Sequence, residues 1–234
     1  MRILAFETSA KAASVALLED DKLVGEIYQN TGLTHSQTLM VMAQDLLNQC
    51  NVKVGDIQAL AVANGPGSFT GVRIGVAAAK GFAWGAQLPC YGVSTLEAMA
   101  YSLGIWQGYV CPVMDARRSQ VYNALFYVNQ GQLSRVTPDR AIALEVLQQQ
   151  LQELEGPIFL VGDGSNLCHS RLAGNVANLV LPQEHRLHQR ATGVALVARK
   201  LALAGESADG CTLTPNYLRL SQAERERLEK GQSI

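Results

Sequence analysis

The sequence lacks an excess of charge of either sign. Its 19 Lys and Arg residues nearly balance 20 Asp and Glu residues, which leaves a formal net charge of −1. A chain that binds nucleic acid on its own usually carries a basic domain or stripe, because the phosphate backbone dominates such binding. The composition therefore argues against a protein that holds a nucleic acid by itself.

Cysteine patterns are also missing. There are five cysteines, an odd number that argues against a disulfide framework, and no C-x-x-C pair that could begin a zinc motif. Cys90 and Cys111 lie in apolar strand-like runs and are predicted to be small core residues. We expect stability to come from a packed core, which a chain with 48% hydrophobic and 17% charged residues can form.

Long hydrophobic runs are absent as well. The most apolar stretch, 72–86, is interrupted by Arg73 and Lys80 and is too short to span a bilayer. The N-terminus enters a strand pattern at once and reaches Glu7 within a few residues, without the apolar region of a signal peptide. We therefore expect a cytoplasmic protein with no membrane partner.

Apolar periodicity predicts an α/β chain with two similar halves. Each half begins with a strand that ends in an acid, Glu7 or Asp115, followed by a second strand, a tight turn and a third strand. Helices and strands then alternate, which is typical of mixed sheets covered by helices. Strands are predicted at 2–7, 12–18, 22–28, 57–63, 90–93, 109–114, 120–128, 132–136 and 157–161. Helices are predicted at 34–50, 71–86, 94–104, 141–154, 165–172 and 191–204.

Three parts of the chain are expected from this pattern. They are an N-terminal subdomain at 1–104, a C-terminal subdomain at 105–220 and a charged tail at 221–234. A repeat of this length indicates a duplicated subdomain and not a solenoid. The alternative is a chance similarity between two common strand-turn-strand patterns.

The strongest local signal is a Gly/Pro loop that joins a strand to a helix. Its glycines permit backbone geometries that other residues avoid, and Ser68 or Thr70 can cap the helix. Two interpretations stay open, an anion-binding helix N-terminus and a tight structural turn. The spacing matches neither a P-loop nor a nucleophile elbow, so Ser68 is not predicted to be a nucleophile. The loop consists of Gly65, Pro66, Gly67, Ser68, Phe69, Thr70 and Gly71.

The helices predicted at 34–50 and 71–86 carry more apolar surface than one sheet requires. The second has only Arg73 and Lys80 as charged residues, and the first contains an apolar run at 39–43. Excess apolar surface usually marks an interaction site, although the other half of the chain could also bury it. The predicted partner-contact residues are Leu39, Met42, Ala43, Leu46, Val72, Gly75, Val76 and Ala79.

The stretch from Gly65 to Gly75, G-P-G-S-F-T-G-V-R-I-G, resembles the signature of the TsaB (YeaZ) family. Residues 3–9 are similar to the opening strand of that family, and further matches lie at 92–96, 115–117, 121–122 and 217–219. The resemblance covers essentially the whole chain. It implies the fold of the actin-like ATPase superfamily (ASKHA), with two ribonuclease-H-like mixed-sheet subdomains.

The resemblance also implies a function. It points to a non-catalytic subunit of the complex that makes N6-threonylcarbamoyladenosine in tRNA (t6A37). The implied partners are the catalytic paralogue TsaD and the ATPase TsaE, with TsaC supplying threonylcarbamoyl-adenylate. TsaD, or a second copy of the chain in a homodimer, would dock through the helices at 34–50 and 71–86. The tRNA would be bound only indirectly, through the complex.

One motif distinguishes the catalytic TsaD from a non-catalytic relative. In TsaD, G-V-N-H-x-E-G-H carries two metal-binding histidines, and the corresponding positions here are Thr95 and Met99, which suit such a metal poorly. We therefore expect no catalytic residue, no metal and no cofactor. Glu7 and Asp115 stand where ATPases of the superfamily keep acids for magnesium, and we interpret them as vestigial nucleotide-cleft acids. An ATP-binding enzyme of the sugar-kinase type is the alternative function.

Overall fold

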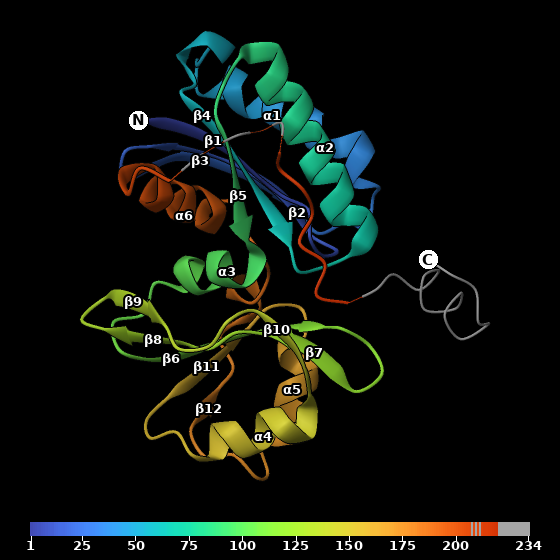
Figure 1. The fold of residues 1–234 in the computed structure, drawn as a ribbon, viewed down its shortest axis with the longest axis vertical. Helices are drawn as coiled ribbons and strands as arrows, with labels where there is room; N and C mark the ends of the chain where they lie inside the picture. The colour runs from blue at the N-terminus through green and yellow to red at the C-terminus, as the bar shows by residue number, and fades with distance from the viewer. Residues whose placement is uncertain (207, 209, 211, 220–234) are drawn as a thin grey trace, which may run out of the picture.

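Two mixed β-sheets, each with helices packed on it, lie one above the other along the long axis of the molecule (Figure 1). The computed structural model describes residues 1–206, 208, 210 and 212–219. The charged tail expected at 221–234 lies outside the described residues. Helix α3 (Thr95–Leu103) lies between the two sheets and connects the first half of the chain to the second.

The first sheet has five strands in the order β3-β2-β1-β4-β5. Strand β1 pairs antiparallel with β2 and parallel with β4, which places the earliest strand at the centre of the sheet. All residues of β1 after Arg2 are buried, because helices cover both faces. The strands are β1 (Arg2–Glu7), β2 (Ala13–Glu19), β3 (Lys22–Gln29), β4 (Ala59–Gly65) and β5 (Cys90–Ser94).

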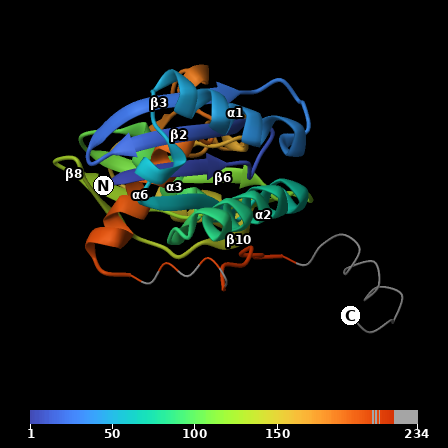
Figure 2. The same cartoon turned by 90° about the horizontal axis from the view of Figure 1, so that it is seen from above.

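Helices α1 (His35–Gln49) and α2 (Phe69–Ala86) cover one face of this sheet, and α6 (Ala191–Leu203) covers the other (Figures 1 and 2). Successive side chains of β1 point to opposite faces of the sheet. Leu4 and Phe6 therefore pack with α1 and α2, and Ile3 and Ala5 pack with α6. Helix α6 falls within 105–220, the range expected for the C-terminal subdomain, but it packs on the first sheet. A segment that follows the second sheet in the sequence therefore completes the first half of the structure.

The second sheet is built around β6, and one of its predicted strands is divided. Residues 120–128 were expected to form a single strand, but β7 pairs with the end of β6 and β8 pairs with its beginning. Strands β10 and β12 were not predicted, and residues 141–143 of β10 were expected to belong to the helix at 141–154. The elements are β6 (Gly108–Asp115), β7 (Gln120–Asn123), β8 (Phe126–Asn129), β9 (Gln132–Arg135), β10 (Arg140–Ala143), α4 (Leu144–Gln152), β11 (Ile158–Val161), α5 (Ser165–Leu172) and β12 (Leu179–Val180), with 3₁₀ turns at Val54–Asp56 and Glu184–Arg186.

Side-chain caps fix where two of the helices begin. The Ser68 hydroxyl accepts a hydrogen bond from the Gly71 amide at 3.3 Å, and Ser94 does the same for Glu97 at 3.2 Å. Ser68 is one of the two caps that the sequence offered for α2. Helix α1 follows Thr34, whose side chain makes no cap hydrogen bond.

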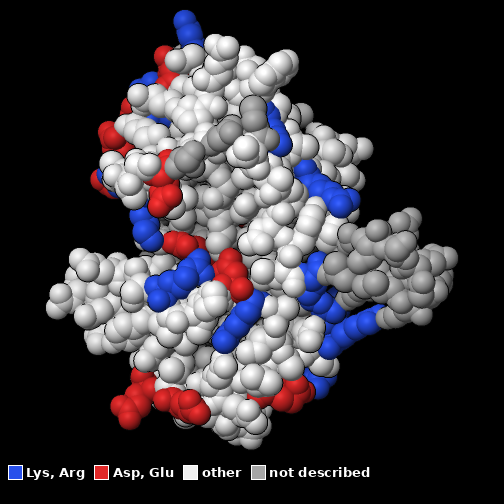
Figure 3. Space-filling model, in the orientation of Figure 1, with Lys and Arg blue, Asp and Glu red and all other residues white. Residues whose placement is uncertain are grey.

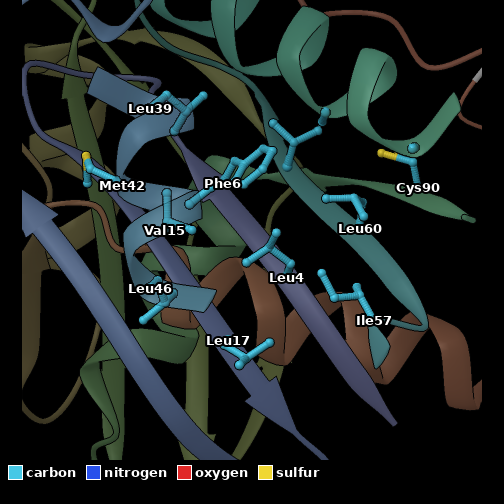
Figure 4. Close-up of a cluster of buried hydrophobic side chains, with 14 of the residues drawn as sticks. Leu4, Phe6, Val15, Leu17, Leu39, Met42, Leu46, Ile57, Leu60 and Cys90 are labelled. Atoms are coloured by element: carbon cyan, nitrogen blue, oxygen red, sulfur yellow. The ribbon is translucent and has the colours of Figure 1, made fainter. Parts of the chain in front are cut away.

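The eight predicted partner-contact residues lie inside this chain. They face the first sheet from α1 and α2, together with Leu4, Phe6 and Leu60 (Figure 4). Val76, at 4%, is the most exposed of the seven that have a side chain beyond hydrogen. The prediction that they touch a partner is therefore wrong. The period that marks an apolar helix face is the same whether the sheet or another protein covers that face.

Glycine at position 71 is needed for the close approach of helix α2 to the end of β1. A Cβ added there would lie 2.1 Å from the Thr8 carbonyl oxygen, which is backbone and cannot rotate away. We expect Gly71→Ala to lower the free energy of unfolding by at least about 1–3 kcal/mol, the usual cost of overpacking. Urea unfolding of the isolated chain measures the change.

Gly81→Ala is the matched control on the same helix. A Cβ at Gly81 would have no neighbour within 4 Å. Alanine also favours helix over glycine, so this variant should gain about 0.5–1 kcal/mol. Equal effects of the two substitutions would show that the contact with Thr8 does not constrain α2.

Candidate functional site

The outward side of α2 is apolar and faces solvent. Trp84 is 82% exposed, and Ala77, Gly81 and Gly85 are exposed on the same helix. On α1, Val41 is 57% and Met40 is 42% exposed. We call these six residues of α1 and α2 the outer helix face. Helices on the surface of a monomer normally carry polar residues in such positions, so this face has the character of an interaction surface.

The Gly/Pro loop is a crossing point of three backbone segments. The Ser68 amide donates to the Ser9 carbonyl oxygen at 2.6 Å, and the Thr8 hydroxyl donates to the Gly71 carbonyl oxygen at 2.8 Å. A Cβ at Gly65 would lie 2.4 Å from the Asn216 carbonyl oxygen. Close backbone contacts thus account for the glycines, which favours the structural interpretation of the loop.

A segment near the C-terminus lies along α2, and sequence reasoning did not foresee it. We call residues 212–219 the strap; it is seen beside α2 in Figures 1 and 2. The Asn216 amide donates to the Asn64 carbonyl oxygen at 2.6 Å, and the Lys80 amine donates to the Leu213 carbonyl oxygen at 3.1 Å. The only signal in the sequence was the family match at 217–219.

An aromatic stack fastens the strap to the start of α2. The rings of Phe69 and Tyr217 are parallel, with centroids 3.9 Å apart. The Arg73 guanidinium lies 4.7 Å from the Phe69 ring centroid and donates to the Tyr217 hydroxyl at 2.7 Å. Stacking and the cation–π contact each contribute stabilising energy in addition to the burial of apolar area. The cluster therefore holds the strap in a defined position.

A polar cavity of about 570 Å³ lies between the two halves, beside the Gly/Pro loop. Asp115 lines it, as expected for an acid at the end of β6, whereas Glu7 does not. Asp163 lines the cavity too, and the sequence signal for it was its position in a Gly-Asp-Gly loop after a predicted strand. Other lining residues are Ser9, Lys11, Ser68, Thr70, Arg117, Tyr122 and Arg219.

Glu7 is completely buried below this region. Burial raises its pKa from the ordinary 4.5 to about 7, and the charge of Asp163 acts in the same direction. The Ser9 amide donates to Oε1 at 2.6 Å and opposes the shift, while Oε2 has no hydrogen-bond partner among the described residues. A carboxyl held in its neutral form is a poor magnesium ligand.

Thr95 and Met99, the two positions at which the resemblance implied a loss of metal-binding histidines, lie inside helix α3. Thr95 is 0% and Met99 is 3% exposed, and Met99 packs with Leu96 and Leu103 in a core cluster. Among the described residues, no group of three His, Cys, Asp or Glu side chains is placed to hold a metal ion. These two side chains therefore serve the packing of α3 between the sheets.

Comparison with known proteins identifies the family. A model of the TsaD family, described as tRNA N6-adenosine threonylcarbamoyltransferase, matches residues 27–226. The TsaB protein of Bacillus subtilis is 34% identical over 231 residues, covering 98% of this chain and 99% of that protein. The chain belongs to the TsaB family. The TsaB protein of Escherichia coli is 35% identical over 224 residues, covering 94% of this chain and 95% of that protein.

Solved structures agree with this family. YeaZ from Pseudomonas aeruginosa superposes with a TM-score of 0.77 at 26% identity, covering 93% of this chain and 99% of that chain. The ethanolamine utilization protein EutJ from Carboxydothermus hydrogenoformans shares the fold alone, with a TM-score of 0.51 at 14% identity, covering 84% of this chain and 89% of that chain. The fold is that of YeaZ, and its mixed α/β architecture with two sheets agrees with the fold class that the resemblance implied. Among the described residues, no helix has the length and apolar character needed to cross a membrane.

The raised pKa of Glu7 makes the stability of the fold depend on pH. Between pH 4.5 and about pH 7 the folded chain keeps a proton that the unfolded chain has lost. The stabilising contribution of Glu7 is therefore complete below pH 4.5 and is lost as the pH rises through about 7. We expect a loss of about 3 kcal/mol from this group between those limits.

Urea unfolding at about pH 5 and about pH 8 measures this loss. Glu7→Gln, which carries no titrating group, should flatten the difference between the two pH values. Glu155→Gln, at an exposed carboxyl, is the control and should leave the wild-type difference in place. An unchanged difference in Glu7→Gln would mean that Glu7 is already ionised in the folded chain.

Proposed function

We propose that this chain is a non-catalytic subunit in the synthesis of tRNA threonylcarbamoyladenosine and that it docks onto a TsaD-type catalytic relative. The relatives from Bacillus subtilis and Escherichia coli are named as tRNA threonylcarbamoyladenosine biosynthesis proteins. The observation that supports the docking role is the outer helix face, an exposed apolar surface on an otherwise well-packed domain.

The shape of the outer helix face suits another helix. Ala77, Gly81 and Gly85 recur at four-residue spacing, so a facing helix can approach the backbone of α2 closely. Trp84 supplies a large apolar side chain of the type that dominates the energy of many interfaces. A catalytic relative of the same family would present corresponding helices, and the two proteins would pack α1 and α2 against their counterparts. A homodimer through the same face is the competing arrangement, and TsaE is the further partner that the resemblance implies.

The interior of the chain supports a non-catalytic role. Thr95 and Met99 are enclosed in the core and do not reach the cavity between the halves. Glu7 is enclosed as well and is held neutral over much of the pH range by its burial. The groups that a catalytic relative would use for metal binding are therefore used here for packing.

A charge on the outer helix face should prevent docking. Ala77 is exposed, so Ala77→Glu leaves the fold intact but would bury an unpaired carboxylate in the complex. We expect affinity for the cognate TsaD to fall at least about tenfold, which corresponds to about 1.4 kcal/mol. Co-purification followed by sizing of the complex measures the change.

Leu203→Glu is the matched control, because Leu203 is 71% exposed on α6, on the opposite face of the first sheet. It should bind TsaD as the wild type does. Val76→Glu is not a test of docking, because Val76 lies in the core and its replacement would unfold the chain. A folded Ala77→Glu variant that still forms the complex would exclude this face as the interface.

The non-catalytic role predicts that Glu7 can be neutralised without loss of turnover. In a reconstituted reaction with TsaD, TsaE and TsaC, Glu7→Gln should support threonylcarbamoyl transfer to tRNA at the wild-type rate, because the carboxyl is enclosed and makes no contact with the cavity. The measurement is the initial rate of tRNA modification, with complex formation checked by sizing. A complex that assembles but is inactive would favour the alternative of an ATP-binding enzyme.

A further inference from the structure

The strap contacts both halves of the molecule. On the first half, the Asn216 amide donates to the Asn64 carbonyl oxygen at 2.6 Å. On the second half, the guanidinium of Arg219 donates to the carbonyl oxygen of Ala116 and to that of Arg117. The strap therefore reaches from the end of β4, in the first sheet, to the turn that follows β6, in the second.

The first sheet leaves room for the strap at two glycines. A Cβ at Gly92 on β5 would lie 2.5 Å from a side-chain carbon of Leu213, and a Cβ at Gly65 on β4 would lie 2.4 Å from the Asn216 carbonyl oxygen. The backbone of Gly92 is outside the left-handed region, so it is the space beside this residue, and not its conformation, that excludes a side chain. The shape of β4 and β5 is thus matched to the path of the strap.

The end of the strap forms part of the wall of the cavity between the halves. Arg219 lines this cavity together with Asp115 of the second half and with Ser68 and Thr70 of the first. Because the wall is built from both halves, the width of the cavity depends on how far apart the halves stand. A segment that is bonded to both of them limits that separation.

The turn that accepts the bonds from Arg219 has a disfavoured backbone conformation. Arg117, Arg118 and Ser119 have φ values of 62°, 55° and 56°, in a left-handed region that residues with a side chain rarely adopt. Such a conformation costs free energy and persists where the surrounding structure holds it. Bonds from Arg219 to two carbonyl oxygens at the start of this turn help to hold it.

The other side of the molecule joins the halves by different means. Figure 1 shows α6 and β9 on the side away from α2 and the strap. Arg135 of β9 forms an ion pair with Glu97 of α3 at 2.7 Å, and Lys200 of α6 contacts the same carboxylate at 3.2 Å. Acidic and basic side chains are seen together on that side in Figure 3, where the halves meet. The ion pairs and the packing of α3 therefore connect the halves on one side, and the strap connects them on the other.

We propose that the strap is a clamp that holds the two halves closed around the cavity, and that its release opens the cavity. The halves then turn apart about the side of α3, where one core cluster contains residues of α3 and of β6. The strap packs Leu213 at the rim of the core of the first half, and Tyr217 is 38% exposed. A segment with so little buried surface opens at a lower free energy than the whole domain.

The clamp acts within this chain and needs no partner, so it is independent of the proposed function. Its test measures how freely solvent reaches Met114, which lines the cavity and is 2% exposed. Hydroxyl radicals convert a methionine that they can reach to the sulfoxide. Met99 is the internal control, because it is 3% exposed and belongs to the same core cluster but lies outside the cavity lining. Met40, which is 42% exposed, reports the radical dose.

Two variants of the full chain release the strap in different ways. Tyr217→Ala removes the stack with Phe69 and the hydrogen bond from Arg73, and Tyr217 lies outside the cavity lining. Arg219→Gln removes the guanidinium that is bonded to the turn after β6. Arg171→Gln, at an exposed arginine of α5, is the control variant.

We expect Tyr217→Ala to raise the rate of oxidation of Met114 at least about threefold, because an aromatic pair and a hydrogen bond that hold the strap are lost. Arg219→Gln should act in the same direction. Met99 should stay protected in both variants, and Arg171→Gln should behave as the wild type.

An unchanged rate at Met114 in Tyr217→Ala would overturn the proposal. An increase confined to Arg219→Gln would overturn it as well, since it would reflect only the loss of one residue from the cavity wall. Equal increases at Met99 and Met114 would mean that the strap supports the packing of the whole core, which also contradicts a clamp that opens the cavity alone.

Discussion

The close crossing of backbone segments at the Gly/Pro loop constrains the rest of this structure. The end of β1, the start of α2 and the strap meet there, and three of the approaches leave no room for a Cβ. Backbone groups cannot rotate away as side chains do, so the positions of all three segments are fixed together. The loop sets where α2 lies on the first sheet, where the strap runs, and how one wall of the cavity is formed.

Helix α2 has three sides with different surroundings. Its inner side packs on the first sheet, one edge binds the strap through Arg73 and Lys80, and its outer side is left apolar and open. A helix with no acidic residue over its whole length is consistent with these demands, since each of the three sides has a neighbour or is proposed to have one. In the proposed function, a TsaD-type partner covers the last of the three sides.

Sequence reasoning placed most elements but misjudged which side of a helix is free. The range of α5 and the cap at Ser68 agree with the sequence, because they depend on neighbours in the chain. The contact residues chosen on α1 and α2 are core residues, because periodicity reports that a face is apolar and not what covers it. The exposed positions Ala77, Gly81 and Gly85 were overlooked, since small residues give only a weak hydrophobic signal.

The sequence by itself determined the α/β character, the two similar halves and the family. These follow from local patterns and from motifs, which are properties of neighbouring residues. Only the tertiary structure decided that α6 and the strap return to the first half and that Glu7 is enclosed while Asp115 and Asp163 face the cavity. Each of these depends on contacts between residues far apart in the chain, and neither composition nor periodicity encodes which distant segments will meet.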